Sequence, residues 1–223
     1  MTRLLLVLAL VVGSAGPAAS PLRVKASPAV APCVAAAALA FERATGRAVA
    51  VETAAIGAHD SANGADVVVA ADQELNRVIE SGATSPDLDI DVAKIPWVLA
   101  RSAESSAVDM AALAHTTAPV RMLGGTAGRE ALRVLEKQGS APKQLARVRE
   151  VRELRLAQGE LAIVPLSLAG SLPVSSLAVP PLTARALGVR ASSRQEAART
   201  FLDFLAGEQG NAAFRACGRP AAR

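Results

Sequence analysis

Short apolar segments alternate with longer segments of helical periodicity along most of the chain, and this alternation limits the possible folds more than any other feature. Leu22–Ala26 has the residues of a short strand and leads into a helical pattern that ends at Gly46, a residue suited to helix ends. Asp66–Ala70 contains a continuous apolar run typical of a buried strand, and a helix follows it. Repeated strand–helix units predict an α/β fold with mainly parallel sheets and helices on both faces.

The remaining segments follow the same order. Further strands are predicted at 48–53, 95–100, 120–123 and 161–165, and an interrupted extended segment is predicted at 173–187. Further helices are predicted at 72–81, 129–138, 150–158, 193–206 and 208–217. We expect Asp72 to cap the helix that it begins, and Trp97 to pack in the core or at a hinge. Asp89 and Asp91 are interpreted as loop-capping residues after Pro86.

Residues 1–20 have the pattern of a secretory signal peptide. Arg3 precedes the apolar run Leu4–Val12, and the small-residue segment 13–20 follows it. This run is about half the length that spans a bilayer, so a cleaved signal is expected rather than a membrane anchor. The sequence therefore predicts an exported, periplasmic protein.

The composition excludes several kinds of site. The chain has 223 residues, of which 51% are hydrophobic, so it contains enough apolar material for a core. Only 2% are aromatic, which argues against sites that stack rings on sugars or nucleic-acid bases. Two His and two Cys cannot build a three-histidine metal site or a four-cysteine zinc site, and we expect no metal and no cofactor.

The net charge of +4 does not indicate nucleic-acid binding. Arginine and glutamate alternate between positions 147 and 155, as on a solvated face with salt bridges. Ser27, His59 and Asp60 are not interpreted as a hydrolase triad because the chain has no G-x-S-x-G motif. His59 and His115 are interpreted as exposed loop residues. We expect no enzymatic activity.

Three segments carry a resemblance to a known family. They are AAAALAFERATG at 35–46, GADVVVAAD at 64–72, and ARTFLDFL at 198–205 followed by Gly210 and 214–218. In order and spacing they resemble the opening, central and closing motifs of periplasmic molybdate-binding proteins, which belong to the type II solute-binding proteins of ABC transporters. The resemblance covers Leu22 to Gly218. Gly64 replaces the Pro, and Ala70 the Ser, of the family's "PADV-x-x-SAD" motif.

This resemblance implies a two-lobed α/β fold of the periplasmic-binding-protein type, with the ligand between the lobes. After the signal peptide at 1–20, one lobe would comprise 21–97 plus 181–223, and the other 98–180. Two strands would cross between the lobes near 95–101 and 180–185. The lobes would close around the ligand.

Proteins of this family hold a tetrahedral oxyanion with backbone N–H groups at helix starts and with hydroxyl groups. The ligand-binding candidates implied here are Ser27, Ala29, Thr53, Ile56, Thr126, Ala127 and Val151. Ala29 and Ile56 (or its neighbour Ala55) stand where the family has its ligand serines, and Ala127 and Val151 where it has backbone donors. The turn 124–128 is either such an anion-binding helix start or a plain structural turn, and it is not a nucleotide P-loop because Arg129 replaces the Lys.

The sequence also departs from the family. Pro165 and Leu168 stand where characterised members have a Tyr and an Asp. Losing a hydroxyl from a buried anion site costs about 1–3 kcal/mol. Either the ligand differs, or donors such as Ser27, Thr53 and Ser61 replace the lost ones.

Cys33 lies on the first predicted helix and Cys217 on the last, and both fall in the same implied lobe. Because an exported protein is exposed to oxidising conditions, a disulfide between them is one expectation, and two separately buried thiols are the other.

Two functions remain open at this point. The first is capture of a small oxyanion such as molybdate or tungstate by a monomeric protein, for delivery to an ABC permease in the inner membrane. The second is a degenerate member of the same fold that serves as a sensor or partner-binding module, with a different ligand or none.

Overall fold

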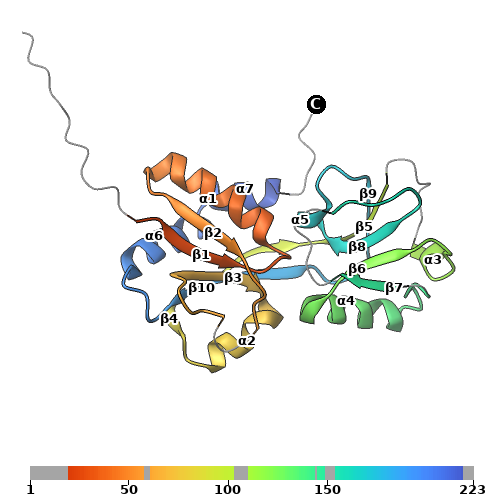
Figure 1. Cartoon of the computed structure of the whole chain (residues 1–223), viewed down its shortest axis with the longest axis horizontal. Coiled ribbons are helices and arrows are strands. Elements are labelled where there is room, and N and C mark those ends of the chain that lie inside the picture. Colours follow the sequence, from red (N-terminus) through yellow and green to blue (C-terminus); the bar gives the residue numbers. More distant parts are fainter. Residues whose placement is uncertain (1–19, 58–60, 103–109, 144, 149–153, 218–223) are drawn as a thin grey trace, which may run out of the picture.

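The structure is a computed structural model, and it describes residues 20–57, 61–102, 110–143, 145–148 and 154–217. Its strands form two five-stranded sheets that lie side by side in two lobes (Figure 1). The first sheet has the order β2-β1-β3-β10-β4, with bounds Val49–Thr53, Leu22–Ala26, Val67–Ala71, Leu182–Val189 and Thr84–Ile95. The second has the order β7-β6-β8-β5-β9, with bounds Leu145–Val148, Val120–Leu123, Leu161–Pro165, Trp97–Arg101 and Val174–Ser176.

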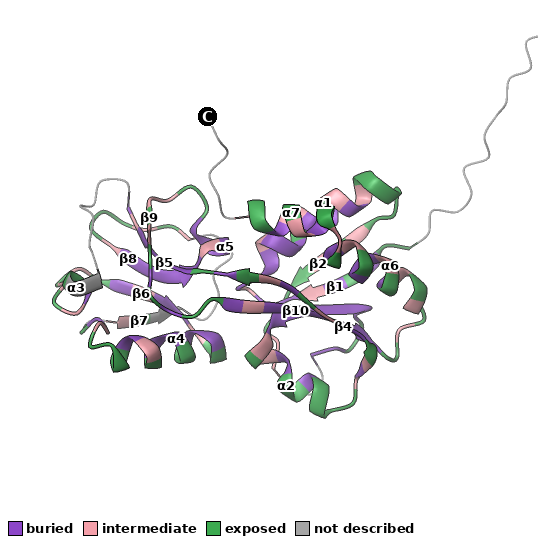
Figure 2. Ribbon diagram, turned by 180° about the vertical axis from the view of Figure 1, so that it is seen from behind, coloured by how far each residue is buried: buried purple, intermediate pink, exposed green. Residues whose placement is uncertain are grey.

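Helices cover the sheets of both lobes (Figures 1 and 2). The first lobe carries α1 (Ala31–Thr45), α2 (Asp72–Glu80), α6 (Gln195–Ala206) and α7 (Glu208–Ala216). The second carries α3 (Met110–Leu113), α4 (Gly125–Lys137) and α5 (Leu166–Ala169). The predicted α/β fold with two lobes is confirmed. Residues 1–19, which the sequence predicts to be part of a signal peptide, lie outside the described residues. Within the described ranges, no helix is long and apolar enough to cross a membrane.

The continuous apolar run of β3 reflects burial on both of its faces. Val67 and Val69 pack in the core that α1 and α6 cover, whereas Val68 and Ala70 pack in a second core with Leu75 of α2. All five residues of β3 are buried. A strand with helices on both sides has no polar face, which is why its sequence shows no alternation.

The pairing of strands is more mixed than the repeated strand–helix units predicted. β1 pairs in parallel with β2 and β3, and β6 pairs in parallel with β7 and β8. β10 pairs antiparallel with β3 and β4, and β5 pairs antiparallel with β8 and β9. The antiparallel strands are those that carry the chain between the lobes. It leaves the first sheet after Ile95 and returns to it at Leu182.

Several local predictions are wrong. Asp89 and Asp91 do not cap a loop but belong to the twelve-residue strand β4. Asp72 is not a helix cap, because the N-cap of α2 is Ala71, and its carboxylate binds Arg185 of β10 instead. β7 was not predicted, and residues 154–157 are not helical, while 149–153 of the predicted helix 150–158 lie outside the described residues. The helix expected from residue 129 begins earlier, at Gly125.

Helix α1 has residues suited to both of its ends. Pro32 lies in its first turn, and Gly46 ends it with φ of 70°, donating its N–H to the carbonyl of Glu42. A disulfide joins Cys33 of this helix to Cys217, the residue after α7, with 5.1 Å between the Cα atoms. The bond attaches the C-terminal helix to the first helix of the same lobe.

Candidate ligand site between the lobes

The two lobes face each other where β1, β3 and β6 end. Ser27 follows β1, α2 follows β3, and α4 follows β6 almost immediately. The carboxyl ends of strands in α/β sheets are the usual place for ligands, because the loops and helix starts there expose unpaired backbone groups. A cavity of about 210 Å³ lies between the lobes beside the two crossings, lined by Gln73 of α2, Ala127 of α4 and Leu182 of β10 among others, and Ser27 is not part of its lining.

Ser27 is fixed by its own backbone. Its N–H donates to the carbonyl of Val69 at 2.9 Å, and its carbonyl accepts the N–H of Ala31 at 2.9 Å. The residue is completely buried, and its Oγ makes no hydrogen bond of acceptable geometry. A buried hydroxyl without such a bond is uncommon, since burying it uncompensated costs about 1–3 kcal/mol.

Glu74 of α2 brings a carboxylate to the same place. Its Oε2 accepts the N–H of Ala71 at 3.2 Å, so the side chain turns back over the start of its own helix. Burial raises the pKa of the Glu74 carboxyl, and the nearby hydroxyl of Ser27 and the Ala71 N–H offset part of that effect. Ser27 Oγ therefore lies close enough to the carboxylate to stabilise its charge, although the pair does not meet the geometric criteria for a hydrogen bond.

The start of α4 lies opposite Glu74. A Cβ built on Gly125 would lie 3.7 Å from Glu74 Oε1, and Gly125 has φ of 80°. The N-terminus of α4 has no side-chain cap and no acidic residue in its first turn. Its first backbone N–H groups therefore lack a partner within the helix, and they form the positive end of the helix dipole. We call Ser27, Glu74 and Gly125–Ala127 the interlobe site.

Glycine is required where α4 packs on β6. A Cβ on Gly128 would lie 1.8 Å from the carbonyl oxygen of Leu123, closer than any real contact allows. This close approach holds the first turn of α4 against the end of the strand. The turn 124–128 thus has a structural role, whatever else it does.

A second polar contact joins the lobes. Ser167 of α5 donates its hydroxyl hydrogen to the carbonyl of Ala29 at 2.5 Å, and both residues are buried. Ala29 lies two residues after Ser27 and precedes α1. The lobes therefore touch on both sides of Ser27, through Ser167 and through Glu74.

The candidates from the sequence have different positions in the structure. Ser27 and the α4 residues Thr126 and Ala127 lie at the interlobe site, and Ala29 lies beside it. Thr126 is exposed, and its Oγ1 accepts a hydrogen bond from Arg129 at 3.0 Å. Ala127 is buried.

Of the remaining candidates that the structure describes, neither Thr53 nor Ile56 supplies a buried hydroxyl donor. Thr53 is exposed at the end of β2, and Ile56 packs its side chain against the core under α2. Val151 lies outside the described residues. Pro165 and Leu168 are buried and apolar.

The sequence analysis missed Glu74 of the interlobe site and Ser167, which contacts Ala29 beside it. A glutamate at the third position of a helix is a known capping signal, but that signal does not show which lobe the carboxylate faces. Ser167 follows a strand by two residues, and nothing in the sequence shows that it contacts Ala29.

Across the ranges that the structure describes, no group of three or more His, Cys, Asp or Glu side chains is placed to hold a metal ion.

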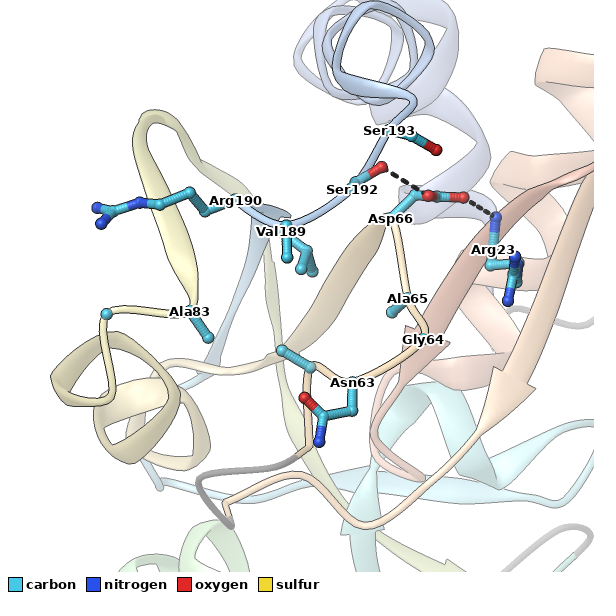
Figure 3. A pocket seen from close by; sticks show the side chains of 13 residues that line it. Arg23, Asn63, Gly64, Ala65, Asp66, Ala83, Val189, Arg190, Ser192 and Ser193 are labelled. Carbon is cyan, nitrogen blue, oxygen red and sulfur yellow. Dashed lines mark hydrogen bonds between the residues drawn. The ribbon is translucent and has the colours of Figure 1, made fainter.

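A larger hollow of about 520 Å³ lies on the first lobe, away from the second (Figure 3). Asp66 forms its inner wall and is fully engaged, accepting hydrogen bonds from the Arg23 N–H at 2.8 Å, Ser192 Oγ at 2.6 Å and Arg194 at 3.1 Å. These hydrogen bonds join segments of the first lobe, so Asp66 has a structural role at this hollow.

Solved structures with this fold bind different solutes. The periplasmic molybdate-binding protein of Azotobacter vinelandii superposes with a TM-score of 0.71 at 20% identity, over 91% of this chain and 100% of that one. The substrate-binding domain assigned to a molybdenum ABC transporter of Clostridium difficile gives 0.66 at 20% identity, over 91% and 99%. The sulfate-binding protein SubI of Mycobacterium tuberculosis gives 0.63 at 17% identity, over 90% and 87%.

At these identities the structural likeness shows the fold and not the ligand. A comparison with curated protein sequences finds no match. The family model of bacterial extracellular solute-binding proteins, however, matches residues 22–219, which is nearly the whole chain after the predicted signal. The chain therefore belongs to the bacterial extracellular solute-binding protein family.

Proposed function

We propose that this protein is exported to the periplasm, captures a small oxyanion between its lobes and delivers it to an ABC permease in the inner membrane. Molybdate and tungstate are the ligands that the sequence resemblance favours. The observation that carries the proposal is the interlobe site, where Glu74 lies near both the buried hydroxyl of Ser27 and the uncapped start of α4. Backbone N–H groups and hydroxyls are the groups that hold tetrahedral oxyanions in water-excluded sites.

The proposal includes the division of the chain. The signal would comprise residues 1–20, the first lobe 21–97 plus 181–223, and the second lobe 98–180. The protein would act as a monomer, without a cofactor, without nucleic acid and without catalytic activity. The two crossings support this division, since they lie where the chain changes sheets.

One observation favours the alternative, a degenerate member that acts as a sensor or partner-binding module. Ile56 stands where the family has a ligand serine, and its side chain packs against the core instead. The hydroxyl of Thr126 already accepts a hydrogen bond from Arg129. Of the hydroxyl donors at this junction, Ser27 is the one that is buried without a hydrogen bond of acceptable geometry.

Calorimetry on the protein without residues 1–20 separates these functions. Molybdate, tungstate, sulfate and phosphate are titrated in turn, and the thermal midpoint is measured with each anion in excess. The oxyanion function predicts heat and a raised midpoint with at least one anion, because a ligand that binds only the folded state stabilises it. No heat and no shift with any of the four anions would favour the sensor or partner-binding function.

A variant connects binding to the interlobe site. Ser27→Ala removes the hydroxyl and is expected to weaken the bound anion by about 1–2 kcal/mol, or roughly 5- to 30-fold in Kd. Ser171→Ala changes an exposed serine of the second lobe and serves as the matched control. Equal affinity in the wild type and Ser27→Ala would show that the anion binds elsewhere.

A further inference from the structure

The hollow of about 520 Å³ on the first lobe lies at the end of the first sheet that is opposite to the interlobe site (Figure 3). Arg23 is near the start of β1 and Asp66 directly precedes β3, whereas Ser27 and α2 follow the ends of these two parallel strands. β10 runs antiparallel to β3 and ends at the hollow, where Arg190 follows it. A molecule in the hollow would therefore leave the space between the lobes accessible.

Backbone hydrogen bonds between separate chain segments form the walls of this hollow. The N–H of Val189 donates to the carbonyl of Asp66 at 3.0 Å, and the N–H of Arg190 donates to the carbonyl of Ala83 at 2.8 Å. These bonds connect the turns that precede β3, precede β4 and follow β10. A partner would meet walls that are already in place.

The hollow has a single carboxylate among its described lining residues, and the protein itself neutralises that charge. This carboxylate belongs to Asp66. Arg194 lies 3.1 Å from Asp66 Oδ2, and the N–H of Arg23 and the hydroxyl of Ser192 donate to the same group. Because only 9% of the Asp66 side chain is exposed, its charge has little contact with anything that enters the hollow.

Three further cations surround the hollow. Arg23 and Arg190 line it and are exposed, and neither guanidinium has a hydrogen bond or an ion pair with a residue that the structure describes. Lys25 donates from Nζ to the carbonyl of Asn63, a lining residue, at 2.8 Å. With Asp66 neutralised, this positive charge is unbalanced, and it favours an anionic partner.

The arrangement of the cations indicates the shape of that partner. Arg23 and Arg190 lie on opposite sides of the hollow, and their side chains do not converge on its centre (Figure 3). A site for one small anion needs donors that converge. A peptide chain with several carboxylates can instead cross the hollow and place a carboxylate beside each arginine. A membrane surface is too flat to enter a concave site and would meet only its rim.

We propose that this hollow, with Arg23, Lys25 and Arg190 around it, is a docking surface for an acidic segment of a partner protein. Carboxylates of the segment pair with the two arginines, and the segment lies across the turn 63–65 between them. The inference goes beyond solute capture and does not depend on which solute the interlobe site binds. Since the two sites lie at opposite ends of β1 and β3, the protein can hold partner and solute at the same time.

Fluorescence anisotropy tests the docking surface with a fluorescein-labelled peptide of about twelve residues in which glutamate and glycine alternate. One variant combines Arg23→Gln with Arg190→Gln. The matched control combines Arg43→Gln with Arg199→Gln, which removes the same charge from exposed residues of α1 and α6 in the same lobe, outside the lining of the hollow. Circular dichroism melting curves check that both variants are folded.

The Arg23 and Arg190 variant is expected to bind the peptide roughly fivefold more weakly than wild type or worse, because it loses two charge pairs. The control should stay within about twofold of wild type, since its arginines act only through the net charge. Equal weakening in both variants would show that the peptide responds to net charge alone and would overturn the proposal. Absence of peptide binding to the wild type would overturn it as well.

Two further probes test the kind of partner. Free glutamate at the same carboxylate concentration should fail to displace the peptide, and full displacement would show a small-anion site instead. Phosphatidylglycerol vesicles should not sediment the protein through these arginines. Sedimentation that is lost in the Arg23 and Arg190 variant would identify a membrane-binding surface and contradict docking of a protein segment. Each of these failures would leave the oxyanion function standing, because none of the probes tests the interlobe site.

Discussion

At the scale of single residues, Asp66 shows how one side chain joins distant parts of a lobe. It precedes β3 and accepts hydrogen bonds from the backbone of Arg23 in β1 and from the Ser192 and Arg194 side chains that precede α6. Burial raises the pKa of the Asp66 carboxyl, but the Ser192 hydroxyl, the Arg23 N–H and the charge of Arg194 outweigh burial, so that its pKa lies below the ordinary value. The folded protein therefore favours the ionised form.

The lowered pKa fixes the sign of a pH dependence. A carboxyl with a lower pKa in the folded state adds stability above its unfolded pKa of about 3.9, and the protein loses that stability as the pH falls through the folded pKa. Asp66→Asn is expected to reduce the free energy of unfolding by about 1–3 kcal/mol at pH 7, and the difference from wild type should shrink below pH 4. Urea unfolding at pH 7 and pH 3.5 measures both values. A deficit that is the same at both pH values would show that the charge of Asp66 contributes nothing.

At the scale of elements, the C-terminal helix is attached to the lobe in two ways. Phe214 of α7 is buried in the same core as Phe41 of α1, and the disulfide from Cys33 to Cys217 closes a segment of 184 residues. A cross-link over a long segment stabilises a protein mainly by restricting its unfolded chain. Packing positions α7, and the disulfide adds to the stability of the whole lobe.

Removal of this disulfide is expected to destabilise the protein without changing its fold. Cys33→Ser combined with Cys217→Ser should lower the free energy of unfolding by about 2–5 kcal/mol. Dithiothreitol should destabilise the wild type by a similar amount and leave the double variant unaffected. Chemical unfolding with and without reductant measures the difference. Wild-type unfolding that does not respond to full reduction would contradict this prediction.

At the scale of the whole molecule, the lobes are connected by two crossings and by contacts on both sides of Ser27. The hydroxyl of Ser167 reaches the carbonyl of Ala29, and the carboxylate of Glu74 reaches the start of α4. Separation of the lobes would break the first contact and move α4 away from Glu74. These polar contacts add to apolar packing, since one cluster of buried hydrophobic residues includes residues of both lobes.

Ser167→Ala tests the contribution of the first contact. The variant removes the donor to the buried Ala29 carbonyl, so the arrangement with touching lobes should lose about 1–2 kcal/mol relative to a more open one. The radius of gyration of the ligand-free variant, measured by small-angle X-ray scattering, is expected to exceed that of wild type. Ser171→Ala, which changes an exposed serine, should leave it unchanged. Identical scattering of Ser167→Ala and wild type would show that this hydrogen bond does not hold the lobes together.

The sequence predicted correctly those elements whose structure depends on residue types within the element itself. The apolar run before Asp72 predicted β3, and Gly46 predicted the end of α1, because burial on two faces and a left-handed helix end each demand particular residue types. Strand β4 was missed although Leu88 and Val92 follow an alternating pattern, since its aspartates are unfavourable in strands. They are tolerated there because the guanidinium of Arg185, on the neighbouring strand, lies beside them.

The sequence by itself determined the alternation of strands and helices and, through its motifs, the two-lobed α/β class, and it offered Ser27 as a candidate site residue. Only the tertiary structure decided that Glu74 faces the start of α4 and that Ser167 meets Ala29, 138 residues away. A capping glutamate and a serine after a strand are locally ordinary. Their roles arise from contacts between lobes, and such contacts depend on how the sheets are placed in space rather than on any pattern along the chain.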